Sequence, residues 1–179
     1  MADQEYLYRY ATRSKKLAYL ARYVESGNSL YDDSFQYQLK NLTQSELDSF
    51  LHYYIYENHY KMIEILLISG ANIKRNSNMF IDALNKCTPE TIKLLMKFGA
   101  DPNSISGVDY ISSKYVRGDM YVGTIDTDIL NVLIEFGLNV RKILADIEFC
   151  LSVDNDIYNH IPISMEVKKN IKLLKQHII

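Results

Sequence analysis

The sequence predicts an all-α fold of stacked helix pairs, and three observations lead to this prediction. Three segments, residues 62–72, 91–101 and 129–139, align on a shared glycine. In each segment apolar residues stand seven, four and three positions before that glycine, which places them on one face of an α-helix. The chain of 179 residues holds only 7 glycines, so we expect each glycine to stand where the backbone needs it.

The shared glycine is expected to end each of these helices. Gly70, Gly99 and Gly137 follow the last helical turn, where a positive φ is required. A more diverged fourth copy ends at Gly27. The apolar residues at the three shared distances are, in chain order, Ile63, Leu66 and Leu67; Ile92, Leu95 and Met96; and Leu130, Leu133 and Ile134.

Each glycine-ended helix is expected to follow another helix and to pair with it. The preceding helices are predicted over residues 4–15, 46–57, 78–86 and 108–116. A short extra helix is expected from Ser34 to Lys40, and a long connection over 101–125. A last pair is predicted from Arg141 to Leu151 and from Ser164 to His177. The unit is therefore a helix pair, repeated about four to five times with irregular connecting loops.

The predicted helix starts carry capping residues. Thr43 and Glu46 stand at capping-box spacing, and Thr88 precedes a proline at the first helical position. Either Asp126 or Thr127 is expected to cap the helix that ends at Gly137.

We expect one domain over residues 1–179. Residues 1–45 are assigned to a diverged N-terminal repeat or cap, 46–151 to the recognisable repeats and 152–179 to a C-terminal cap. In the last segment Val167, Ile171 and Leu174 form one apolar stripe, and lysines cover the remainder. This pattern is expected when one face closes a core and the other meets water.

These residues resemble the ankyrin repeat, whose unit is two antiparallel helices and a projecting hairpin. In the best-matching copy, Ser49-Phe50-Leu51-His52 stands in the T-P-L-H position of the family signature, Asn58-His59 in the G-H position and Gly70-Ala71 in the G-A position. The third copy keeps Gly99-Ala100-Asp101-Pro102-Asn103. The resemblance covers roughly residues 20–151 and implies an ankyrin-like solenoid.

The resemblance also implies a non-catalytic module that binds a partner protein through a concave groove and the hairpin tips. Tyr53 and Tyr56 occupy positions that face this groove in ankyrin repeats, and exposed tyrosine is a favoured anchor at protein interfaces. Tyr54 is expected in the core. The full set of expected partner-binding residues is Tyr53, Tyr56, Glu57, Lys74, Arg75, Asp82, Asn85 and Lys86.

Two alternatives to groove binding stay open. One is a structural or scaffold role in a larger assembly, in which the whole surface contributes. The other is recruitment of a ubiquitin-ligase adaptor, because residues 161–174 faintly resemble the F-box-like tail of many poxviral ankyrin proteins; we favour a terminal cap. The chain is rich in Ile, Asn, Lys and Tyr, and in this it resembles proteins from AT-rich genomes. This composition favours a large DNA virus as the source. The expected location is then the cytoplasm of the host cell.

Composition argues against nucleic acid and membranes as partners. The formal net charge is -2, so no excess positive field attracts phosphates. The basic residues Arg13, Lys15, Lys16 and Arg22 are interpreted as a solvated helix face. The polar N-terminus does not resemble a signal peptide, and no apolar stretch approaches the roughly 18 residues of a membrane helix. We therefore expect a soluble intracellular protein.

No cofactor, metal or catalytic site is expected. Glycine motifs for phosphate binding are absent from the sequence, and His160 and His177 lack further ligands at metal-binding spacing. His52 is expected to hydrogen-bond neighbouring backbone, and His59 to belong to a helix start. Cys87 precedes a helix N-terminus that would lower a thiol pKa, so it alone keeps an enzyme alternative open.

Overall fold

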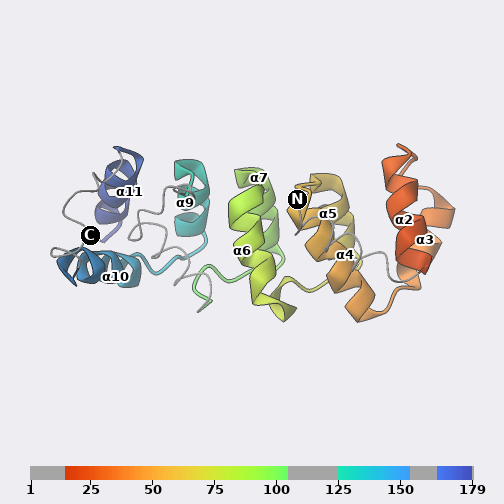
Figure 1. Cartoon of the computed structure of the whole chain (residues 1–179), viewed down its shortest axis with the longest axis horizontal. Coiled ribbons are helices and arrows are strands. Elements are labelled where there is room, and N and C mark those ends of the chain that lie inside the picture. The colour runs from red at the N-terminus through yellow and green to blue at the C-terminus, as the bar shows by residue number, and fades with distance from the viewer. Residues whose placement is uncertain (1–14, 105–124, 154–164, 179) are drawn as a thin grey trace. The chain divides into compact units, whose positions relative to one another are not determined.

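The structure is a computed structural model that describes residues 15–104, 125–153 and 165–178. These ranges hold nine α-helices, one 3-10 turn and no strand (Figure 1). The all-α prediction is therefore confirmed. The predicted helix over 4–15, except for its last residue, and the predicted helix over 108–116 lie outside the described residues. The chain divides into two compact units, Met1–Gly99 and Ala100–Ile179, and the assignment of both to one domain stays a prediction.

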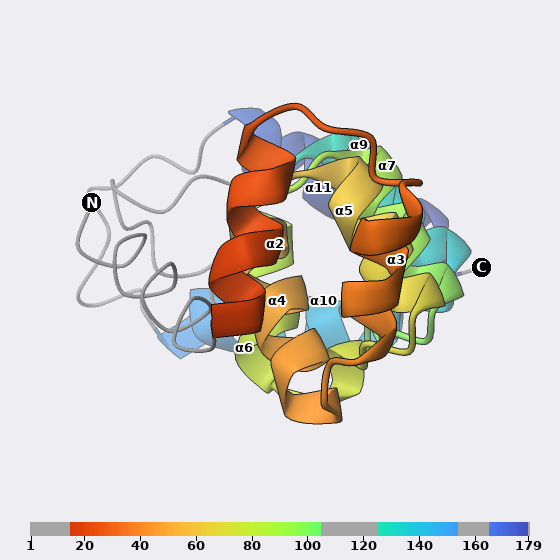
Figure 2. The ribbon, with the colours of Figure 1, turned by 90° about the vertical axis from the view of Figure 1, so that its right-hand side faces the viewer.

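The first unit consists of helix pairs preceded by two further helices. Helices α2 (Lys15–Glu25) and α3 (Asp33–Lys40) come first and pack against each other. The pair α4 (Gln44–Tyr56) and α5 (Tyr60–Ile68) follows, then the short turn η1 (Ile73–Arg75) and the pair α6 (Ser77–Lys86) and α7 (Pro89–Lys97). Within this unit, α4 and α6 lie on one side and α5 and α7 on the other (Figure 2). The extra helix predicted from Ser34 to Lys40 is α3.

The glycines end helices as predicted. All four have a positive φ, which is 72° at Gly27, 99° at Gly70, 92° at Gly99 and 87° at Gly137. At the end of α5 the amide of Gly70 donates to the carbonyl of Leu67, and the next amide donates to the carbonyl of Leu66. This pair of bonds satisfies carbonyls that the helix leaves without a partner. The same pair of bonds occurs at Gly137.

Asn58 ends α4 in the same way, although it carries a side chain. Its φ is 51°, and its own amide and that of His59 donate back to Ile55 and Tyr54. Asparagine tolerates this conformation better than other residues with a Cβ. Asn58 stands where the ankyrin signature has glycine, so the sequence register and the backbone geometry agree.

Helix starts are capped where the sequence predicts. Thr43 and Glu46 form the complete capping box of α4, and the Thr88 hydroxyl accepts from the amide of Thr91 in α7. Asp126 is the residue that caps α9 (Thr127–Glu135), since its carboxylate accepts from the amides of Asp128 and Ile129. This geometry decides between Asp126 and Thr127.

The repeated apolar stripe forms the core. Residues seven and four positions before each of the three later glycines are fully buried, and those three positions before are buried at Leu67 and Met96. Ile134 is the exception, because it is half-exposed. The stripe residues with zero exposure are Ile63, Leu66, Ile92, Leu95, Leu130 and Leu133.

The second unit contains α9, α10 (Val140–Val153) and α11 (Met165–Gln176). Helix α11 packs on both α9 and α10. The Asn170 side chain is fully buried, accepts from the Thr127 hydroxyl at 2.9 Å and donates to the Ile125 carbonyl at 2.9 Å. Leu174 is also fully buried, as the predicted apolar stripe of this helix requires. These contacts tie α11 to the start of α9.

Candidate partner-binding surface

Three residues of α4, spaced one helical turn apart, contact the segments that follow α5. Asp48, His52 and Tyr56 share one face of α4 because residues four apart lie above one another. Asp48 contacts the segment around η1, whereas His52 and Tyr56 contact residues of α6. Of these three residues only Tyr56 belongs to the expected partner-binding set, and this face of α4 serves first to join the repeat to the segments that follow it.

The middle contact is a hydrogen bond between His52 Nε2 and Asp82 Oδ2, 2.6 Å long. The side chains are 15% and 29% exposed, so water reaches the pair only in part. The sequence predicts that the His52 side chain hydrogen-bonds neighbouring backbone. This prediction is wrong for its Nε2 atom. Its partner lies 30 residues away, because the parallel packing of α4 and α6 brings one carboxylate opposite the imidazole.

The outer contact joins Tyr56 and Lys86. The Lys86 ammonium lies 4.8 Å from the centre of the Tyr56 ring. Such a cation–π contact contributes roughly 0.5–1 kcal/mol at an exposed site. Tyr56 is half-buried and Lys86 is exposed, so both residues remain partly accessible to solvent.

The inner contact is a buried carboxylate that fixes the loop after Gly70. Asp48 is 7% exposed, and its Oδ1 accepts from the Asn72 amide and the Gln44 side chain, both at 2.8 Å. Arg75 adds a contact of 3.4 Å to Oδ2, and Gln44 also donates to the Gly70 carbonyl at 2.9 Å. Two side chains of α4 therefore hold the loop in place.

A single asparagine performs the corresponding task in the second unit. The Asn103 side chain donates to the Gly137 carbonyl at 2.8 Å and accepts from the Asn139 amide at 2.6 Å. Gly137 and Asn139 correspond to Gly70 and Asn72 in the repeat alignment. In both units, polar side chains thus fix the loop that follows a helix-ending glycine.

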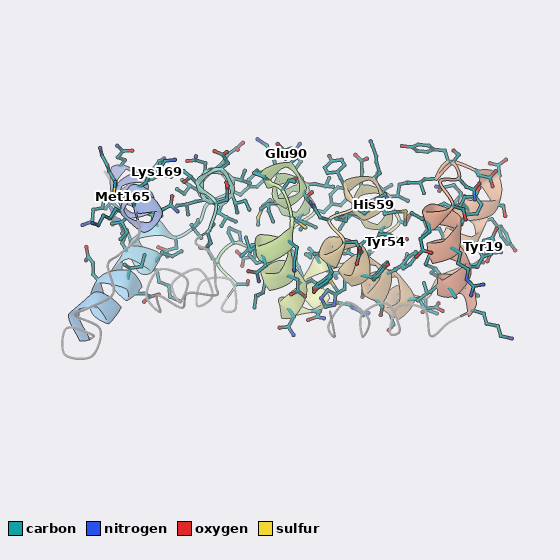
Figure 3. The ribbon with its side chains drawn as sticks, turned by 45° about the horizontal axis from the view of Figure 1, so that its top comes forward. Tyr19, Tyr54, His59, Glu90, Met165 and Lys169 are labelled. Carbon is teal, nitrogen blue, oxygen red and sulfur yellow. The ribbon has the colours of Figure 1, made fainter. Side chains whose placement is uncertain are left out.

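Tyr53 corrects one sequence expectation. It is 8% exposed and its ring packs edge-on against Tyr54, with ring centres 5.0 Å apart. Tyr54 is 4% exposed, and its ring also contacts the rings of Phe50 and His59. Tyr54 and His59 are labelled in Figure 3. Tyr54 lies in the core as predicted, but the prediction of an exposed Tyr53 is wrong. Helix α4 packs against α5, α6 and η1, so its buried residues extend beyond a single apolar stripe of the helix.

The other expected binding residues fall into two groups. Tyr56, Glu57, Asp82, Asn85 and Lys86 lie near the C-terminal ends of α4 and α6, and we call them the α4–α6 face. Glu57, Asn85 and Lys86 are exposed, and Tyr56 and Asp82 are half-buried.

Lys74 and Arg75 form the second group, on η1 beside Asp48. Asp48 lies eight residues before Tyr56, about 12 Å along the axis of α4. Both basic residues are exposed. The Lys74 ammonium lies 3.2 Å from the position that a Cβ on Gly99 would occupy, so it reaches the end of the next helix pair.

Cys87 does not have the properties of a nucleophile. It is 7% exposed, and its thiol donates to the Ile55 carbonyl at 3.3 Å. Burial, with a smaller effect from Asp82, raises the pKa of the Cys87 thiol to about 12. The expectation that the following helix N-terminus lowers this pKa is wrong, because burial outweighs the helix dipole.

The described ranges show no grouping of three His, Cys, Asp or Glu side chains that could bind a metal. His59 caps α5, and its Nδ1 accepts from the Met62 amide at 3.3 Å, which confirms its assignment to a helix start. Within the described part of the chain, no helix is long and apolar enough to span a bilayer.

The sequence did not lead to a prediction of the contacts of Asp48 or of the His52–Asp82 contact. For His52 the signal was present in the spacing, because His52 and Asp82 are 30 residues apart and so are Tyr56 and Lys86. The glycines of these two repeats are 29 residues apart. Side chains separated by about one repeat length are the natural candidates for contacts between stacked repeats.

One comparison with known proteins gives a match. Residues 48–78 match the model of the ankyrin repeat family. This range runs from within α4 through α5 and η1 to the start of α6. No curated protein and no solved structure matches the chain significantly. The helix pairs and this match establish an all-α, ankyrin-like repeat fold, and ankyrin repeats are in general protein–protein interaction modules.

Proposed function

We propose that the chain is a non-catalytic module that binds a partner protein through its α4–α6 face and the hairpin residues Lys74 and Arg75. The observation that carries the proposal is the match to an ankyrin repeat at residues 48–78, because Tyr56 and Glu57 of the face and both hairpin residues lie within it. Asp82, Asn85 and Lys86 belong to the next helix pair.

The chemistry of the α4–α6 face suits a protein partner. The face offers an aromatic ring, an amide, a cation and two carboxylates, which belong to Tyr56, Asn85, Lys86, Glu57 and Asp82. Such mixed groups suit the varied surface of a protein better than they suit the surface of a uniformly charged polymer. The Tyr56 ring is already oriented by Lys86, so less side-chain entropy is lost when a partner covers it.

Photocrosslinking tests which surface the partner touches. Benzoylphenylalanine replaces Tyr56 in one variant and Tyr37, which is 66% exposed on α3, in a matched control. The proposal expects one protein of the source-cell extract to crosslink from position 56 and not from position 37. Equal crosslinking from both positions would contradict it and favour the scaffold role.

We propose a cytoplasmic protein of a large DNA virus that uses no cofactor and does not bind nucleic acid. Recruitment of a ubiquitin-ligase adaptor is less favoured, because the buried side chains of Asn170 and Leu174 already pack α11 against its own unit. Identification of the crosslinked protein as a ligase adaptor would reverse this preference.

A further inference from the structure

Helix α11 exposes a basic surface that the stacking of repeats does not use. Lys168, Lys169, Lys172 and Lys175 are all exposed, whereas Asn170 and Leu174 between them are fully buried. Met165, 80% exposed, precedes them at the start of the helix (Figure 3). We call these four lysines the α11 basic face. It belongs to the second unit, whereas the α4–α6 face belongs to the first.

Within the part of the chain that the structure describes, few groups compensate the charges of this face. Among the described residues, the one ion pair formed by the four lysines joins Lys175 to Glu148 at 3.6 Å, with both side chains more than half exposed. The one carboxylate in the sequence of α11 belongs to Glu166. The net charge of the whole chain is -2, so the face is a local excess of positive charge and not part of a basic protein.

Lys168, Lys169 and Lys172 are poorly placed for the stability of α11, whereas Lys175 in the last turn suits the macrodipole. Lys168 and Lys172 are four residues apart, and Lys169 and Lys172 are three apart, so like charges repel along the helix. Lys168 and Lys169 also lie near the helix N-terminus, where the macrodipole disfavours positive charge. A terminal helix needs a polar outer face for solubility, but charges of both signs would meet that need at lower cost.

We propose that the α11 basic face docks an acidic segment of a partner protein. Lys168, Lys172 and Lys175 are about one turn apart and span roughly 10 Å along the helix. Each ammonium is a compact charge that binds one carboxylate. A segment whose Asp and Glu side chains recur at similar spacing therefore fits, and Met165 offers one apolar contact at the edge.

Other anionic partners fit this face less well. Nucleic-acid surfaces combine cations with aromatic rings that stack on bases, but the exposed residues of α11 are not aromatic. An interfacial membrane helix buries an apolar face in lipid. The apolar face of α11 is turned inward, where Leu174 is buried and Ile171 and Leu173 are half-buried.

Binding of a fluorescent oligo-glutamate peptide to the full chain tests the proposal. The variant K168Q/K169Q/K172Q removes three charges from the face, and K40Q/K97Q/K142Q removes three from exposed lysines on α3, α7 and α10. We expect the first variant to bind at least about tenfold more weakly at physiological salt, and the control to bind like the unmodified chain. Equal weakening in both variants, or no binding by the unmodified chain, would overturn the proposal.

Two further measurements keep the test independent of folding and of partner class. Carbodiimide crosslinking of the unmodified chain should form amide bonds from the peptide carboxylates to Lys168, Lys169 or Lys172, mapped by mass spectrometry. Crosslinks spread over all exposed lysines would contradict the proposal. Tighter, lysine-dependent binding of a single-stranded oligonucleotide or of phosphatidylserine vesicles would assign the face to that partner instead.

Discussion

At the scale of single residues, backbone conformation at the helix ends is set by a few side chains or by their absence. Gly99 has a φ of 92°, and a Cβ added there would lie 3.1 Å from Lys74 Cε. The lysine tip can move away, but the left-handed backbone remains unfavourable for most residues. The strain of a substitution therefore comes mainly from the backbone.

Gly99→Val is expected to lower the free energy of unfolding by at least about 2 kcal/mol, because a β-branched residue is poorly tolerated at positive φ. Gly99→Asn serves as the control and should cost clearly less, since asparagine adopts this conformation at Asn58 in the same chain. Urea denaturation measures both. Equal stability of the valine variant and the unmodified chain would contradict the assigned helix end.

The His52–Asp82 hydrogen bond is expected to couple two repeats energetically. A double-mutant cycle with His52→Ala and Asp82→Ala should give a coupling free energy of about 1 kcal/mol or more, since the contact is short and partly shielded from water. The cycle subtracts the effect of each truncation alone. A coupling near zero would mean that the two side chains do not stabilise the stack.

Cys87 should be unreactive in the folded chain. Because burial raises the pKa of its thiol to about 12, only about one molecule in ten thousand carries the thiolate at pH 8. In a Cys150→Ser background, iodoacetamide should label Cys87 at least about a hundredfold more slowly in native than in unfolded protein. Labelling of the native chain at the unfolded rate would restore the enzyme alternative.

At the scale of elements, local sequence predicts helices and their caps better than it predicts what covers them. The capping box of Thr43, the proline start after Thr88 and the glycine ends depend on neighbouring residues only, and all were confirmed. Burial of Tyr53 and the partner of His52 depend on which other elements pack against α4. The apolar periodicity of a single helix does not predict which distant segments pack against it.

Helix α11 is expected to be an integral part of the second unit. Asn170→Ala should lower the melting temperature, because the Ile125 carbonyl and the Thr127 hydroxyl lose their buried partner, at a cost of roughly 1–3 kcal/mol. Gln176→Ala, on the exposed side of the same helix, is the matched control.

Deletion of residues 161–179 extends the test to the whole element. The truncated chain should melt at lower temperature and bind the dye ANS, because the side of α9 that α11 covers would be exposed. An unchanged melting curve together with the loss of a ligase adaptor would favour the docking-tail alternative.

At the scale of the whole molecule, the same arrangement recurs in both units: a helix ends at a glycine, and side-chain hydrogen bonds fix the loop that follows. Asp48 with Gln44 in one unit and Asn103 in the other bind the loop after a helix-ending glycine. Of the expected binding residues, Tyr53 is buried and is not a suitable position for a binding test, because its truncation would open the core.

The affinity of the crosslinked partner for Tyr56→Ala/Lys86→Ala tests the binding account most directly. Ile68→Ala/Phe98→Ala is the matched control, because it removes two exposed side chains, 70% and 42% accessible, at the ends of α5 and α7. With both variants folded, the account predicts that the first loses at least about 2 kcal/mol of binding free energy, roughly thirtyfold in Kd, while the control binds normally. Unchanged affinity of the folded Tyr56→Ala/Lys86→Ala variant would contradict it.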